Sequence, residues 1–134
     1  MKTEPDTSNG SPTKNNDHVH FVRKLLQSRR KAEALRWLLG SQASRRRTLG
    51  GFTGAKSSAN LVRELYATGA VKVIAVEIKS KPTGSQWTEK LVMELPSDPK
   101  LRESIFRWCK RQGAKVGYSP ETDGGEKHLY LLLA

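Results

Sequence analysis

The chain has little of several residue types, and each shortage excludes a class of protein. Its 134 residues include one cysteine, Cys109, which excludes an intramolecular disulfide framework and a multi-cysteine zinc site. No apolar run approaches the ~18 residues that cross a bilayer. The N-terminus lacks the apolar stretch of a secretory signal. We therefore expect one cytoplasmic domain with a short tail.

Acidic residues are also scarce, and the resulting positive charge is concentrated in one segment. Asp and Glu number 13 against 24 Lys and Arg, a formal net charge of +11. Residues 18–55 hold nine of the basic residues and a single acidic one, Glu33, so this segment alone carries +8. Residues 1–17 are polar and carry a net −1, and we expect them to form a disordered tail.

Residues 18–40 are predicted to form a basic amphipathic helix. The segment has neither Pro nor Gly before Gly40, and Asp17 precedes it as a helix N-cap. Apolar residues recur at helical spacing and form a stripe. The stripe consists of Phe21, Val22, Leu25, Ala32, Leu35, Leu38 and Leu39. Residues 41–47 follow as a basic linker.

The basic side chains of the helix and linker allow three interpretations: a solvated face, a nucleic-acid contact, or a contact with an anionic membrane surface. They are Arg23, Lys24, Arg29, Arg30, Lys31, Arg45, Arg46 and Arg47. Guanidinium groups pair with phosphates in bidentate fashion, and binding releases counterions from the nucleic acid. The arginines continue past Gly40, which favours a phosphate backbone over a flat bilayer.

Residues 48–134 are predicted to fold as an α+β domain of the order βαββαβ. The expected strands are 48–53, 71–79, 89–95 and 127–134, and the expected helices follow Ser58 and Pro99. The two halves resemble each other, since Gly69-Ala70 and Gly113-Ala114 each link a helix to an extended segment. This order resembles the ferredoxin-like domains, such as the ACT and RNA-recognition-motif families. The resemblance implies an antiparallel sheet with two helices on one face.

Neither family's function is carried over to this chain. The outward positions of the two central strands lack the base-stacking aromatic residues of an RNA-recognition motif, and the ACT-type glycine turn, at Gly54-Ala55, is a common feature. Those positions and the last strand are instead predicted to form a half-apolar interaction face. It consists of Val73, Ala75, Val92, His128, Tyr130 and Leu132. A soluble chain would cover such a face. The cover would be the basic helix, a second copy in a symmetric dimer, or a ligand or another protein.

The sequence offers few candidates for catalysis or metal binding. His18 and His20 are two residues apart and therefore point to different faces of a helix. His128 could meet Glu77 or Glu94 on the sheet, and Cys109 lies on the predicted buried side of its helix. We expect no cofactor, no metal, no small-molecule ligand and no enzymatic activity.

The glycine-rich stretch from Gly50 to Ser58 is not a nucleotide-binding P-loop, because its glycine spacing and its lysine position are both wrong. Lys56 and the amides at the start of the following helix could still hold one phosphate. The sequence therefore predicts a small binding module that contacts DNA, RNA or another polyanion. The alternative is a protein-interaction or assembly module, which would use the sheet face or edge and bind an acidic partner through the basic segment.

Overall fold

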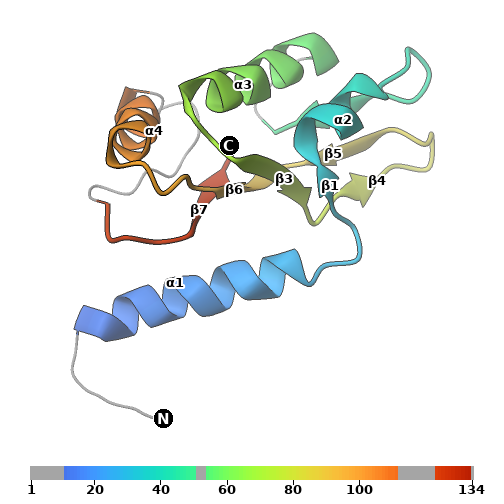
Figure 1. Ribbon diagram of the computed structural model, residues 1–134. Helices are drawn as coiled ribbons and strands as arrows, with labels where there is room; N and C mark the ends of the chain where they lie inside the picture. Colours follow the sequence, from blue (N-terminus) through green and yellow to red (C-terminus); the bar gives the residue numbers. More distant parts are fainter. Residues whose placement is uncertain (1–10, 51–53, 112–122, 134) are drawn as a thin grey trace.

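A computed structural model describes residues 11–50, 54–111 and 123–133, which form helices and strands in one α+β arrangement (Figure 1). The helices are α1 (Ser11–Leu26), α2 (Ala34–Leu39), α3 (Ala55–Thr68) and α4 (Pro99–Arg111). The strands are β1 (Ala32–Glu33), β2 (Arg47–Leu49), β3 (Lys72–Val76), β4 (Lys79–Ser80), β5 (Gln86–Thr88), β6 (Lys90–Glu94) and β7 (His128–Leu132).

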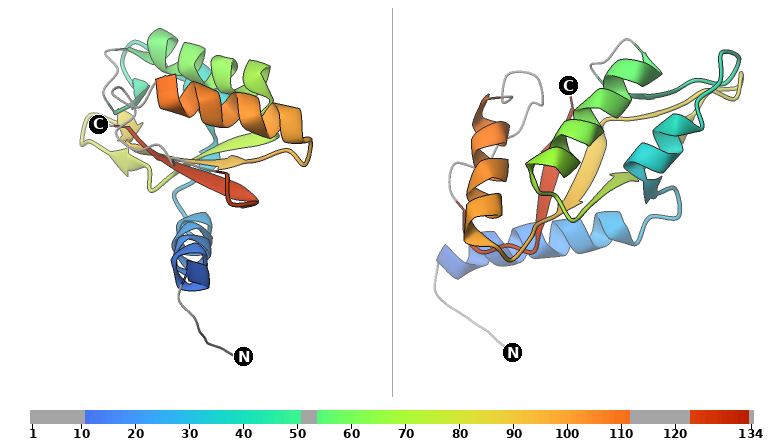
Figure 2. Two further views of the ribbon diagram at one scale, coloured as in Figure 1. Left: turned by 90° about the vertical axis from the view of Figure 1, so that its left-hand side faces the viewer. Right: turned by 45° about the horizontal axis from the view of Figure 1, so that its top comes forward.

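The larger sheet is antiparallel, with the order β1-β3-β6-β7. Val73 of β3 lies opposite Met93 of β6, which in turn lies opposite Leu129 of β7. Helices α2, α3 and α4 cover one face of the sheet, and α1 runs along the other (Figures 1 and 2). The sheet is therefore the middle of three layers.

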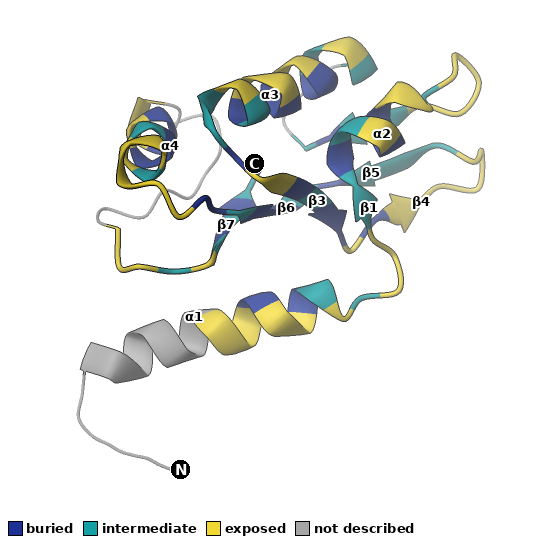
Figure 3. Ribbon diagram, viewed as in Figure 1, coloured by how far each residue is buried: buried dark blue, intermediate teal, exposed yellow. Residues whose placement is uncertain are grey.

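Both faces of the larger sheet are buried (Figure 3). The face toward α2, α3 and α4 carries the main core, in which β-strand side chains pack with Leu65, Ile105 and Trp108. On the opposite face, Val76 and Val92 form a smaller cluster with side chains of α1.

The smaller sheet has the order β2-β5-β4, with β2 parallel and β4 antiparallel to β5. The buried Ser58 ties this sheet to the start of α3. Its hydroxyl accepts a hydrogen bond from the Leu49 amide (3.0 Å) and donates one to the Gly54 carbonyl (2.9 Å). The position of the smaller sheet relative to the main core is thus set by a satisfied buried polar group.

The prediction of one helix over 18–40 is wrong. Residues 32–33 instead pair with β3, with Ala32 opposite Ala75, and divide the segment into α1 and α2. The Glu33 carboxylate accepts the amides of Leu35 (3.2 Å) and Arg36 (2.7 Å) and so begins the second helix. Helix α1 begins at Ser11, within the segment expected to be a disordered tail, and residues 1–10 lie outside the described part.

The predicted α+β class is confirmed, but the ferredoxin-like strand order is not. In a βαββαβ sheet, the strand expected at 48–53 would lie among the other three. Its described part, in β2, belongs to the smaller sheet, while β6 pairs directly with β7 and the short β1 forms the edge beside β3. The second half of the internal resemblance, at Gly113-Ala114, lies outside the described residues.

The predicted interaction face is wrong for β3. Val73 and Ala75 lie in the main core under the helices, whereas Ile74 and Val76 face α1. Val92 and Tyr130 do lie on the predicted face, where α1 covers them. The basic helix, one of the expected covers, therefore packs on this face.

Candidate nucleic-acid interface

The basic run 29–31 lies beside the smaller sheet. It belongs to the connection between α1 and β1, where the Arg30 carbonyl accepts a hydrogen bond from the Ile78 amide (2.9 Å). The Arg30 guanidinium also donates to the Ser80 hydroxyl on β4. These contacts hold the run against the edge strand of this sheet.

The second basic run, residues 45–47, reaches the same sheet from the side of β2. The Arg46 amide donates to the Ser85 hydroxyl (3.2 Å), and the Arg46 carbonyl accepts from the Gln86 amide (2.7 Å). The Arg45 side chain passes over Gly84, where an added Cβ would lie 3.3 Å from it. Gly84 has a φ of +95°, so a side chain at this position would also strain the backbone. The loop before β2 and the turn between β4 and β5 thus lie side by side.

The smaller sheet adds two basic side chains that the sequence analysis missed, Lys79 and Lys81. They flank Ser80 and are exposed. The sequence feature that could have identified them is the absence of acidic residues from 78–88, which matches a similar absence from 34–63. We use the term basic surface for the exposed cationic side chains gathered here. It consists of Arg29, Arg30, Arg45, Arg46, Lys79 and Lys81.

Two of the predicted binding residues are held in contacts within the protein instead. The half-buried Arg47 donates from Nη1 to the Trp37 carbonyl (3.0 Å), at the C-terminal end of α2. Lys31 donates from Nζ to the Leu26 carbonyl at the end of α1. Cationic groups at these positions lie at the C-terminal ends of helices, where they interact favourably with the helix dipole.

Lys56 lies near the basic surface, across a groove of about 590 Å³ between the loop before β2 and the first turns of α3. Arg46, Lys56 and Arg63 line this groove, and none of the residues that line it is acidic. The groove thus extends the positive potential from the basic surface to α3.

Arg23 and Lys24 lie apart from these residues, exposed in the last turn of α1. Arg23 lines a separate groove of about 240 Å³ between α1 and the start of β7, together with Glu126 and His128. The sequence placed both residues in one binding set with 45–47, but the fold puts α1 across the sheet from α2, α3 and α4 (Figure 1).

The remaining residues of the predicted interaction face are only partly accessible. His128, Tyr130 and Leu132 are half-buried on β7. The Tyr130 ring meets Phe21 of α1 edge to face, with ring centroids 4.8 Å apart. An interaction of this face with another protein would therefore have to displace α1.

The candidates for catalysis and metal binding occupy ordinary structural positions. His128 lies opposite Glu94 in the strand register, while Glu77 pairs with Lys90. Burial raises the pKa of the Cys109 thiol to about 11, so this side chain is held as a neutral thiol. No group of three potential ligands that could hold a metal ion occurs in the described ranges. None of the helices described is long and apolar enough to cross a membrane.

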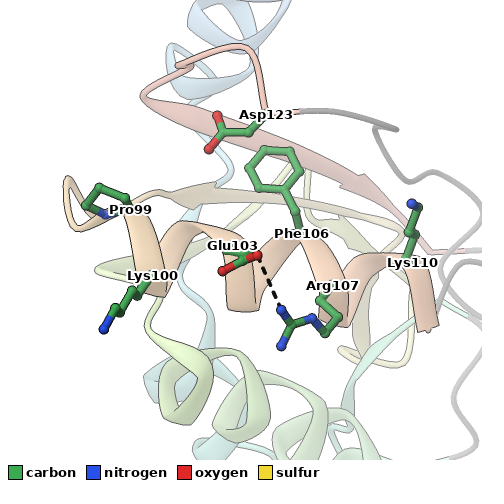
Figure 4. A pocket seen from close by; sticks show the side chains of 7 residues that line it. All are labelled: Pro99, Lys100, Glu103, Phe106, Arg107, Lys110 and Asp123. Atoms are coloured by element: carbon green, nitrogen blue, oxygen red, sulfur yellow. Dashed lines mark ion pairs between the residues drawn. The ribbon is translucent and has the colours of Figure 1, made fainter.

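A further hollow, of about 560 Å³, lies on the outer side of α4 (Figure 4). Phe106 points into it, and Glu103 and Arg107 form an ion pair of 3.4 Å along the helix. Asp123, at its far wall, is held by Arg102 through two hydrogen bonds of 2.9 and 2.6 Å. Because both signs of charge line this hollow, it is less suited to a polyanion than the basic surface.

Comparisons of the chain with protein-family models, with curated proteins and with solved structures find no match.

Proposed function

We propose that this chain is a non-enzymatic module that binds nucleic acid through its phosphate backbone. One observation carries the proposal: the basic runs 29–31 and 45–47 lie on either side of one small sheet, and Lys79 on β4 and Lys81 in the turn after it add two further cations. The sequence alone did not require residues 29–31 and 45–47 to lie beside the same small sheet.

The chemistry of the basic surface suits phosphates. Four of its six charges come from arginines, whose planar guanidinium groups bind phosphate oxygens in pairs. Segments 34–63 and 78–88 contain no Asp or Glu, so no carboxylate within them competes for these cations. Contacts of this kind position a nucleic acid without reading its sequence. A bound phosphate backbone would continue along the groove that Lys56 lines, toward α3.

The proposal is tested with a double variant, Arg45→Gln/Arg46→Gln. Arg47 is left intact because it caps α2. Binding of labelled single-stranded DNA, duplex DNA and RNA is measured by fluorescence anisotropy across a salt series. A plot of log K against log salt has a negative slope, and each lost phosphate contact makes that slope shallower by about 0.7 to 0.9. We expect the double variant to lose between one and two contacts and to bind all three ligands more weakly.

A matched control is Lys100→Gln/Lys110→Gln, which removes the same charge from exposed positions on α4. Helix α4 lies on the opposite side of the molecule from β4 and β5 (Figure 1). We expect this control to retain the wild-type salt slope. Equal losses in the two double variants would mean that only net charge matters, and the proposed interface would be wrong. A wild-type protein that does not bind any of the ligands near physiological salt would overturn the function itself.

A further inference from the structure

Trp87 lies in the middle of the smaller sheet, next to the basic surface. It is directly opposite Thr48 of β2 and Lys79 of β4, so these three side chains form a row on one face of the sheet. The neighbouring Gln86 points to the other face, where its Oε1 accepts a hydrogen bond of 2.9 Å from Nε1 of Trp37 in α2. Trp87 therefore projects from the face that α2 does not cover.

The three tryptophans of the chain differ in what they can contact. Trp37 is 6% exposed, and Trp108 is 2% exposed with its indole N–H bonded to Glu64 (3.0 Å). Trp87 is only half-buried, and the ammonium of Lys79 lies 4.7 Å from its ring centroid. The Trp87 ring is thus a flat aromatic surface beside which the Lys79 ammonium lies.

We propose that the ligand is a single-stranded nucleic acid and that Trp87 stacks on one of its unpaired bases. The inference rests on the proposed function, since the phosphates that flank this base would contact the basic surface. An unpaired base offers its π-face to an indole, whereas the bases of a duplex are already stacked on one another. The ammonium of Lys79, 4.7 Å from the ring centroid, places a cation beside the ring, as a backbone beside a stacked base requires.

The contact between Lys79 and Trp87 in the free protein is weak enough for a stacked base to replace it. An exposed cation–π contact is weaker than the stacking of a base on an aromatic ring. The Lys79 stem is flexible, so an arriving base displaces its ammonium, which then pairs with an adjacent phosphate. One side chain thus protects the ring in the free protein and contacts the backbone in the complex.

The test compares wild type with Trp87→Ala and Trp87→Phe, using a labelled oligothymidine of about 16 nucleotides and a duplex of the same length. Trp87→Ala is expected to weaken binding of the single strand about tenfold or more, because a stacked base is lost. Its salt slope and its binding of the duplex remain those of the wild type. Trp87→Phe retains an aromatic ring and is expected to recover most of the lost affinity.

Tryptophan emission gives a second readout that does not depend on affinity. The oligothymidine is expected to quench the wild-type emission and to leave that of Trp87→Phe unchanged, because Trp37 and Trp108 are buried. Trp87→Phe also keeps the experiment decisive if Trp87→Ala fails to fold.

The outcomes separate the inference from the function on which it rests. If the wild type binds but Trp87→Ala binds the single strand as tightly as it does, or quenching persists in Trp87→Phe, stacking is overturned and phosphate binding stands. Equal weakening of single strand and duplex by Trp87→Ala would likewise overturn stacking. If the wild type binds neither ligand, both proposals fail.

Discussion

Tyr66 joins α3 to the start of α2 and to β3. Its hydroxyl donates to the Glu33 carboxylate, which begins α2, and accepts the Val73 amide of β3 (3.0 Å). Burial raises the pKa of the Glu33 carboxyl, but the hydrogen bonds from Tyr66 and from the amides of Arg36 and Leu35 outweigh it. The pKa of Glu33 therefore lies below its ordinary value. Burial and this same carboxylate raise the pKa of Tyr66 to about 12.

Replacing Tyr66 with phenylalanine should cost about 1 to 3 kcal/mol, because the Val73 amide and the Glu33 carboxylate both lose a partner. A lowered pKa in the folded state means that ionised Glu33 stabilises the fold above its ordinary pKa. That stability is lost as the pH falls through the lowered value. We therefore expect urea unfolding at a series of acidic pH values to show a weaker pH dependence in Tyr66→Phe.

Glu33→Gln is the matching variant, because its amide oxygen can still accept the amides of Leu35 and Arg36. It should lose the same acid dependence while retaining the start of α2. If Tyr66→Phe keeps the full pH dependence of the wild type, another group causes it.

At the scale of the element, two buried side chains attach the part of α1 whose side chains are described, residues 19–26. They are Val22 and Leu25, which pack on Val76 and Val92 of the sheet. The docking of α1 and the pairing of β1 with β3 lie on either side of the basic run 29–31. The position of this run therefore depends on both.

Leu25→Ala should loosen α1, because truncation of a buried leucine costs about 2 to 5 kcal/mol where the neighbours do not relax. The bonds after Arg23 and Lys24 then become accessible to trypsin in the native protein. We expect cleavage there to be faster in Leu25→Ala than in wild type, as followed by mass spectrometry. Leu39→Ala removes an exposed leucine, 59% accessible, and should leave the rate unchanged. Equal rates in all three proteins would show that Leu25 does not hold α1 in place.

The same elements show which parts of the fold the sequence can predict. Helices α3 and α4 followed from their apolar faces and from Gly69, whose φ of +128° ends α3. The sequence analysis predicted wrongly which side chains of β3 face the main core, because α1 buries the second face of the sheet. Val73 and Ile74 therefore both meet apolar neighbours, and alternation does not distinguish the faces. The division between α1 and α2 has no Gly or Pro signal, since it is caused by pairing with β3.

The candidate site was predicted only in part, for a similar reason. Arg45 and Arg46 are conspicuous as a run, but Arg47 caps a helix that the sequence did not separate from α1. Lys79 and Trp87 lie 32 and 40 residues beyond Arg47, the last residue of the linker's basic run. The register of β4 and β5 brings these two side chains together. Sites built from cross-strand pairs depend on a register that periodicity alone does not fix.

At the scale of the whole molecule, Cys109 reports on the integrity of the main core. Its thiol is fully buried, and burial raises its pKa to about 11, so both access and thiolate formation oppose reaction. We expect labelling by a disulfide reagent near neutral pH to be at least about a hundredfold slower in the native protein than in guanidinium. The rate should rise with urea in parallel with unfolding. Rapid labelling without denaturant would mean that α4 opens independently of the sheet.

The basic surface consists of guanidinium and ammonium groups, with neither histidine nor carboxylate among its six residues. Counterions compete directly for every phosphate contact that such groups make. Under the proposed function, the ionic strength around the protein would therefore decide whether a polyanion stays bound or is released.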